Sequence, residues 1–175
     1  MTISIYSFAN RLAASGRRGF SAAMASAALV LLSACATHPP QVQHSFQFDA
    51  RKDSPGIEIL DYRYGTSFYG RTDPAWLERG TAQGTSIHGA IRRGDDLYVK
   101  WRIKETGQVF EETVDLRRRM PEDITDHILY FIVRGQQLYV YLVTPQRRSK
   151  DELPNGPRMY GYLKVITLHP DMPSK

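Results

Sequence analysis

The chain has 175 residues, with 23 basic and 18 acidic side chains and a single cysteine. Its positive charge is concentrated at the start, since residues 1–34 hold Arg11, Arg17 and Arg18 and no acidic residue. Residues 35–175 therefore carry 20 basic and 18 acidic side chains, a net charge of +2. This near balance gives no support for nucleic-acid binding. One cysteine excludes an internal disulfide, so a domain of this length must be stabilised by its hydrophobic core.

The first 34 residues have the layout of an export signal. Residues 1–20 form a positively charged region, and Ser21–Leu32 form an apolar run that is too short to span a membrane as a helix. The run ends at Leu32-Ser33-Ala34-Cys35. These four residues resemble the lipobox of bacterial lipoproteins, in which a leucine and two small residues precede a cysteine.

The resemblance implies a defined maturation. A diacylglyceryl thioether forms on the Cys35 sulfur, the chain is cleaved between Ala34 and Cys35, and a further acyl chain such as palmitate is often added to the new amino group. Two or three acyl chains anchor a protein stably, at about 0.8 kcal/mol per buried CH2. No cofactor other than this covalent lipid is expected. The alternative interpretation is that the signal peptide is an ordinary secretory one and that Cys35 is an unmodified small apolar residue after it.

Two further details concern the export pathway and the membrane in which the protein would be anchored. Arg17-Arg18-Gly19-Phe20 resembles the core of a twin-arginine export motif, although paired arginines also orient ordinary secretory signals. Ala36 stands where an aspartate would retain an enteric-type lipoprotein in the inner membrane, so the resemblance favours the outer membrane, facing the periplasm. We expect residues 35–44 to be a lipidated tether and residues 45–175 to be a single β domain.

The remaining chain reads as short strands separated by turns. Alternation of apolar and polar residues predicts strands at Ser45–Phe48, Ile57–Tyr64 and Thr85–Ile91, and Arg158–Leu168 is expected to be the last strand. Two short helices are predicted, at Asp73–Gly80 and over residues 121–127. This pattern predicts an all-β fold, either an antiparallel β-sandwich or a partly closed barrel, with one or two short helices.

The stretch Leu97–Leu116 predicts a hairpin around Thr106-Gly107. Leu97, Val99, Trp101 and Ile103 share one face, and Tyr98, Lys100, Arg102 and Lys104 share the other. A two-residue turn would place the residues opposite one another as follows: Ile103 with Phe110, Trp101 with Glu112, Val99 with Val114, Leu97 with Leu116 and Arg102 with Glu111. Glu112 then lies among apolar neighbours, either as a functional acid or as an edge residue that reaches water.

A second hairpin is predicted from Ile128 to Thr144 around Gly135-Gln136. One face pairs Val133 with Leu138, Phe131 with Val140 and Leu129 with Leu142. The other face pairs Ile132 with Tyr139, Tyr130 with Tyr141 and Ile128 with Val143. Because a sheet with one solvated face would show polar residues there, the tyrosine face must be covered. The cover is either part of this chain, such as residues 160–168 or the turns around Trp76, or a partner bound to a patch of Tyr130, Tyr139 and Tyr141.

Basic residues cluster at three predicted loops, at Arg92-Arg93, at Arg117-Arg118-Arg119 and around Arg147-Arg148-Lys150. They are either solvated turns or contacts for anionic lipid, acidic glycan or an acidic partner. The sequence offers Arg117, Arg118 and Arg119, beside the tyrosines, as a second possible binding surface.

Signals for catalysis are weak. No two of the five histidines have metal-ligand spacing, and no phosphate loop or nucleophile elbow occurs. Ser86 near His88 would need a third partner, and Asp61, Asp115 and Glu112 would have to meet in space. The sequence therefore predicts a non-enzymatic, lipid-anchored envelope lipoprotein that binds a protein, such as an assembly component or an immunity or inhibitor protein. Binding of a glycan such as peptidoglycan is the alternative, followed by a hydrolase. The oligomeric state is not indicated.

Overall fold

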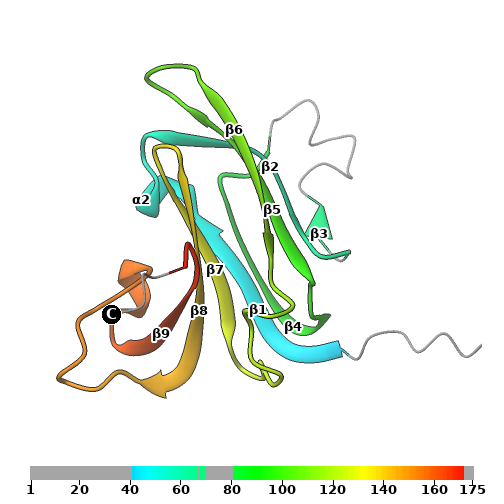
Figure 1. Cartoon of the computed structure of the whole chain (residues 1–175), viewed down its shortest axis with the longest axis vertical. Helices are drawn as coiled ribbons and strands as arrows, with labels where there is room; N and C mark the ends of the chain where they lie inside the picture. The colour runs from blue at the N-terminus through cyan, green and yellow to red at the C-terminus, as the bar shows by residue number, and fades with distance from the viewer. Residues whose placement is uncertain (1–40, 67, 70–80, 172–175) are drawn as a thin grey trace, which may run out of the picture. The chain divides into compact units, whose positions relative to one another are not determined.

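The computed structural model describes residues 41–66, 68–69 and 81–171. Two sheets face one another (Figure 1). The five-stranded sheet has the order β4-β1-β7-β8-β9, and the four-stranded sheet has the order β3-β2-β5-β6. The strands are β1 (Gln41–Asp49), β2 (Ile57–Tyr64), β3 (Phe68–Tyr69), β4 (Gly84–Arg92), β5 (Asp96–Ile103), β6 (Val109–Asp115), β7 (Ile128–Arg134), β8 (Gln137–Arg147) and β9 (Leu163–His169).

The predicted all-β class is confirmed, and the open sheets make the fold a sandwich rather than a barrel. Among the described strands, only β1 and β7 pair in parallel. Helical structure in the described residues is limited to α2 (Ala50–Asp53) and a 3-10 turn, Arg158–Tyr160. None of the described helices is long and apolar enough to cross a membrane. The predicted helix Asp73–Gly80 and the turns around Trp76 lie outside the described residues.

The predicted helix over residues 121–127 is wrong, because this segment forms turns. The Asp123 side chain accepts a hydrogen bond from the Thr125 amide at 2.8 Å, which favours a turn over a helix. The next carboxylate residue, Asp126, has a left-handed φ of 58° and donates its amide to the Gln43 carbonyl at 2.7 Å. The segment is therefore held to β1 by its backbone.

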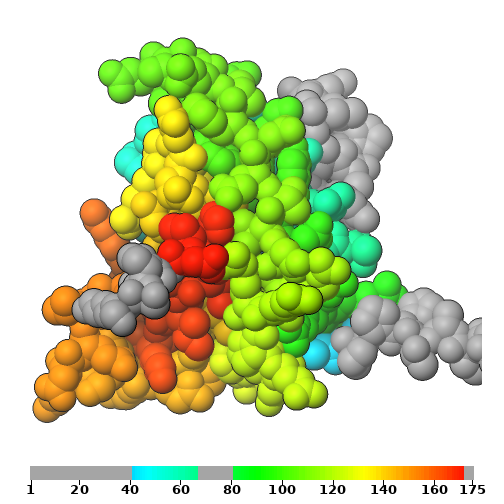
Figure 2. All heavy atoms as spheres, in the orientation of Figure 1, coloured from blue at the N-terminus to red at the C-terminus, as the bar shows by residue number. Residues whose placement is uncertain are grey.

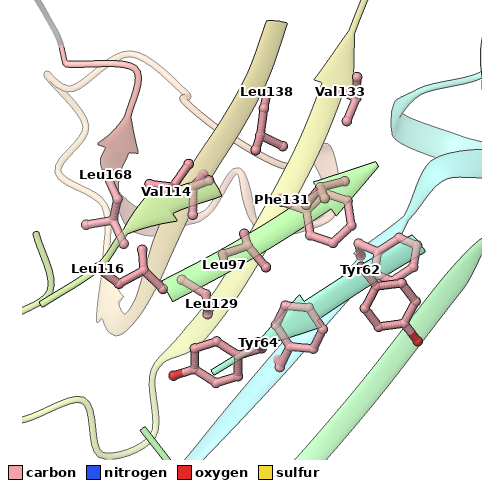
Figure 3. Packing of buried hydrophobic residues seen from close by; sticks show 14 of the residues in the cluster. Tyr62, Tyr64, Leu97, Val114, Leu116, Leu129, Phe131, Val133, Leu138 and Leu168 are labelled. Carbon is pink, nitrogen blue, oxygen red and sulfur yellow. The ribbon is translucent and has the colours of Figure 1, made fainter. Parts of the chain in front are cut away.

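The main core lies between the sheets (Figure 3). Alternation brings Phe46 and Phe48 of β1 against Tyr62 and Tyr64 of β2, and the Phe46 and Tyr64 rings stack with centroids 5.2 Å apart. Trp101 is 1% exposed and donates its indole N–H to the Gly135 carbonyl at 3.0 Å. Since Trp101 lies on β5 and Gly135 joins β7 to β8, this bond links the two sheets.

β1 begins at Gln41, four residues before the predicted start, so residues 41–44 belong to the sheet. His44 is 1% exposed within it. Its Nδ1 lies 2.8 Å from the Val42 carbonyl and its Nε2 lies 3.1 Å from the Tyr64 hydroxyl. Burial lowers the pKa of His44 below its ordinary value, with Arg93 and His127 adding to the effect.

The register of the second hairpin is confirmed at all six predicted pairs. The first hairpin is wrong by two residues, because Trp101 lies opposite Phe110, Leu97 opposite Val114 and Lys100 opposite Glu111. Its turn has four residues, Lys104–Gly107, closed by a hydrogen bond of 2.9 Å from the Ile103 amide to the Gln108 carbonyl. A shift of two residues keeps every side chain on its predicted face.

Candidate functional site

An open, charged cleft of about 620 Å3 lies at the end of the sandwich where β1 begins. The ends of β4 and β6 meet the starts of β1 and β5 there, at the bottom of Figure 1. Four arginines and three aspartates line the cleft together with small polar residues. The lining consists of Arg63, Gly65, Thr66, Arg92, Arg93, Asp95, Asp96, Thr113, Asp115 and Arg117.

Two glycines let the loops behind this cleft approach closely. Gly65 follows β2 with a left-handed φ of 52°, and a Cβ there would come within 2.6 Å of the Gly94 Cα. A Cβ on Gly94 would meet the Tyr64 ring at 2.4 Å. The β4–β5 turn is therefore pressed against Tyr64, whose pKa burial raises to about 12.

Most charged side chains of the cleft form ion pairs or hydrogen bonds with other residues of the protein. Arg63 pairs with Asp96 at 3.1 Å, and Arg117 pairs with Asp115 at 2.7 Å. Hydrogen bonds from the Arg117 side chain and backbone hold the pKa of the Asp115 carboxyl down at about 2. Arg93 donates to the carbonyls of Met120 and Glu122 at 3.1 and 3.0 Å, and so fixes the loop after β6. These exposed ion pairs add little stability.

Arg92 and Asp95 differ from the other charged residues of the cleft. Within the described part of the chain, neither side chain has an ion pair or a hydrogen bond, whereas Arg93 lacks an ion pair but donates to two carbonyls. Arg92 is half-buried, and Asp95 is exposed. One guanidinium and one carboxylate thus remain available to a ligand.

The three predicted arginines do not act together. Arg117 lines the cleft, and Arg118 is exposed beside it. Arg119 instead pairs with Asp171 and donates to the Leu168 carbonyl at 2.7 Å, which ties the loop after β6 to the end of β9. The sequence identified the cluster but could not separate these roles.

The tyrosine face of the second hairpin is a second, smaller core. Tyr130 and Tyr141 are 1% and 4% exposed and pack with Ile132 and Val143. The exposed-patch hypothesis is therefore wrong for Tyr130 and Tyr141, whereas Tyr139 is half-buried. The Tyr130 hydroxyl donates to the Asp53 carboxylate at 2.6 Å, and burial together with this bond raises its pKa.

The cover comes from the C-terminal part of the chain, as one of the two interpretations predicted. Residues 148–162, which we call the C-terminal cover, run beside β8 and β9 and are orange in Figure 1. Gly156 brings the backbone against the Tyr141 ring, Tyr160 packs edge-on to Tyr130 with centroids 6.1 Å apart, and the Tyr160 hydroxyl donates to Gln47 at 2.6 Å. The last strand starts at Leu163 and not at Arg158, because Arg158–Tyr160 forms the 3-10 turn of this cover.

This part of the chain holds most of the exposed large hydrophobic side chains, interspersed with exposed charged residues such as Asp151 and Glu152. Five large hydrophobic side chains are exposed among the described residues, and four of them lie between residues 153 and 166. They are Leu153 (87%), Met159 (56%), Tyr162 (63%) and Ile166 (38%). In Figure 2 the C-terminal cover forms the orange surface at the lower left. The sequence pattern did not reveal this surface, because it predicts a strand from Arg158 onward.

Glu112 lies on edge strand β6, opposite Val99 of β5. Its carboxylate is 2.8 Å from His169 Nε2 on β9. Sequence reasoning missed this pair because β6 and β9 are brought together only by sheet packing.

The serine that lies beside His88 in space is Ser45, not Ser86. The His88 Nδ1 lies 2.7 Å from the Ser45 hydroxyl across the β1–β4 pair, and its Nε2 lies 3.1 Å from Gln43 Nε2. With the Gln43 amide donating, Nδ1 carries the proton and donates to Ser45, the reverse of what a general base requires.

In the described residues, no group of three histidine, cysteine or acidic side chains could hold a metal ion. Ala34 and Cys35 lie outside the described residues. A scan of family models, a search of curated proteins and a search of solved structures each found no match for this chain.

Proposed function

We propose that the protein is a lipid-anchored lipoprotein of the bacterial cell envelope, facing the periplasm from the outer membrane, whose β-sandwich binds a protein partner without catalysing a reaction. The motif Leu32-Ser33-Ala34-Cys35 supports the anchor. The C-terminal cover supports the mode of binding, because it seals an apolar sheet face and also presents Leu153, Met159 and Tyr162 outward.

Tyrosine, methionine and arginine are enriched in protein interfaces, and this surface exposes Tyr162, Met159 and Arg158. Arg147 and Lys150 are exposed next to it. The Arg148 guanidinium donates to the Gly161 carbonyl at 2.9 Å and so fixes the two ends of the C-terminal cover together. A surface held in one shape loses less conformational entropy on binding. A shallow aromatic groove would favour the glycan alternative, but four tyrosines that could supply rings, Tyr62, Tyr64, Tyr130 and Tyr141, are buried.

The anchor is tested with Cys35→Ser in cells. We expect acyl labelling to be lost and an uncleaved precursor to accumulate, because the thiol is the acyl acceptor and acylation precedes cleavage. A Cys35→Ser protein that matures and partitions with membranes like wild type would contradict the anchor.

Partner binding is tested by placing a photocrosslinking amino acid at Tyr162 in intact cells, with the same substitution at Tyr98 as control. Tyr98 is half-buried on the outer face of the other sheet, beside Glu111. We expect a discrete adduct with one envelope protein from position 162 only, and Met159→Asp should remove it without changing the unfolding midpoint. Equal adducts from both positions, or none from position 162, would contradict the proposal.

A further inference from the structure

We propose that the charged cleft at the start of β1 binds the headgroup of an aminophospholipid, such as phosphatidylethanolamine, in the membrane that holds the anchor. This inference rests on the proposed lipid anchor. It assigns a ligand to a surface distinct from the protein-binding C-terminal cover.

Chain length brings the cleft to the membrane. Only five residues separate Cys35 from Gln41, so a fully extended chain places them no more than roughly 20 Å apart. Gln41 lies directly opposite Arg92 in the β1–β4 ladder. With Cys35 acylated, the Arg92 end of the sandwich must therefore stay close to the bilayer surface.

The connectivity of the strands collects the cleft residues at this same end. The turn over residues 93–95 joins β4 of one sheet to β5 of the other. The Gly65 amide donates to the Asp96 carbonyl at 2.9 Å, and the Leu116 amide donates to the Asp95 carbonyl at 2.8 Å. The ends of β2 and β6 are thereby fixed beside the end of β4.

The charges of the cleft match a zwitterionic headgroup. Arginine binds phosphate through paired hydrogen bonds, and Arg92 is the cleft arginine whose side chain has neither an ion pair nor a hydrogen bond among the described residues, since Arg93 donates to two backbone carbonyls. Asp95 supplies a carboxylate for an ammonium group. Arg63–Asp96 and Arg117–Asp115 flank them as internally neutral pairs, so the cleft offers both signs of charge rather than a purely basic patch. Its volume of about 620 Å3 falls in the usual range for ligand sites.

The choice of an aminophospholipid over phosphatidylcholine follows from the ammonium group. A primary ammonium donates three hydrogen bonds, which a carboxylate such as that of Asp95 can accept. The trimethylated group of phosphatidylcholine donates none. The two lipids have the same net charge, so a preference between them reports on this contact and not on long-range electrostatics.

The test uses the mature, acylated protein in vesicles of equal parts phosphatidylethanolamine and phosphatidylcholine. Because acylation blocks the sulfur of Cys35, a second cysteine provides the one free thiol for a nitroxide label. Arg118→Cys places the label beside the cleft without altering its lining, and Thr106→Cys places it in the β5–β6 turn at the other end of those strands. Phosphorus NMR then measures the relaxation of each headgroup separately.

From position 118, we expect the label to relax phosphatidylethanolamine phosphorus at least about twofold faster than phosphatidylcholine phosphorus, which corresponds to a modest preference. Arg92→Gln and Asp95→Asn should each remove the difference, and the label at position 106 should show none. Equal relaxation of the two lipids from position 118, or a preference that survives both substitutions, would overturn the inference.

Mass spectrometry before reconstitution separates the two proposals. A mature chain without acyl groups would contradict the anchor, and the headgroup inference would fall with it. An acylated chain without a headgroup preference would overturn the headgroup inference alone.

Discussion

The outer faces of the two sheets differ in polarity and in whether another part of the chain covers them. The outer face of the β7–β8 pair is apolar, and the C-terminal cover buries it as a second core. The outer face of β2, β5 and β6 is charged and lies open, with Arg102 pairing with Glu58 at 3.0 Å and Lys100 with Glu111 at 3.1 Å. A sheet face that lacks alternating polarity requires additional chain to cover it, whereas a charged face does not. In this protein, residues 148–162 form this cover and contain no strand.

The largest difference between the faces should come from tyrosine. Tyr141→Ala should destabilise the fold by about 3 kcal/mol or more, because it removes a ring that is 4% exposed and leaves a cavity beneath the C-terminal cover. Tyr98→Ala on the open face should cost much less. Urea unfolding of the two variants provides the comparison, and equal midpoints would mean that the cover is not packed against the β7–β8 pair.

A smaller effect is expected where the cover approaches the sheet most closely. Gly156 has a left-handed φ of 76°, and a Cβ there would come within 2.8 Å of the Val165 side chain. Gly156→Ala should therefore cost about 1–3 kcal/mol through backbone strain and overpacking. Hydrogen exchange should show faster opening of β8 and β9. The control is Gly107→Ala in the open β5–β6 turn. Gly107 also has a left-handed φ, of 71°, but nothing lies within 4 Å of a Cβ added there, so this variant introduces backbone strain without overpacking.

Acid sensitivity should originate between the sheets rather than on either outer face. Because the folded-state pKa of His44 lies below its ordinary value of 6.5, the unfolded chain binds a proton more tightly. The contribution of His44 is therefore fully present above pH 6.5 and is lost as the pH falls below it. We expect His44→Gln to reduce the loss of stability between about pH 7 and about pH 5, measured by urea unfolding, since the lowered carboxylate pKa values act at lower pH. An unchanged pH dependence would assign the acid sensitivity to other groups.

The smallest effect is expected from the ion pairs of the open face. Arg102→Ala removes a pair whose side chains are 44% and 41% exposed, and should cost no more than about 0.5 kcal/mol. Thermal unfolding in low and high salt measures it, and a cost comparable with that of Tyr141→Ala would mean that this face is not the solvated one.

The comparison of the two hairpins shows what sequence can determine. Gly135-Gln136 allows a two-residue turn, so all six predicted pairs of the second hairpin were placed correctly. Around Gly107 a four-residue turn is equally compatible with the alternation, which fixes only whether a residue faces inward or outward. The faces of the first hairpin were therefore predicted correctly, and its partners were not.

The cleft lay beyond sequence reasoning for a different reason. Arg92-Arg93 and Arg117–Arg119 were recognised as basic loops, but Arg63 lies within a strand and joins them only because β2, β4 and β6 end together. The pairing of Arg63 with Asp96 likewise depends on how β2 and β5 are aligned. The need to cover the tyrosine face was predicted, and the residues that do so became evident only in three dimensions.

Hydroxyl-radical footprinting of the folded protein, read by mass spectrometry, tests most directly whether the tyrosine face is an internal core. Tyr162, at 63% exposed, should be modified rapidly, whereas Tyr130 and Tyr141, at 1% and 4%, should be protected until the protein unfolds globally. Modification of Tyr130 and Tyr141 in the folded state at the rate of Tyr162 would contradict the existence of a sealed second core.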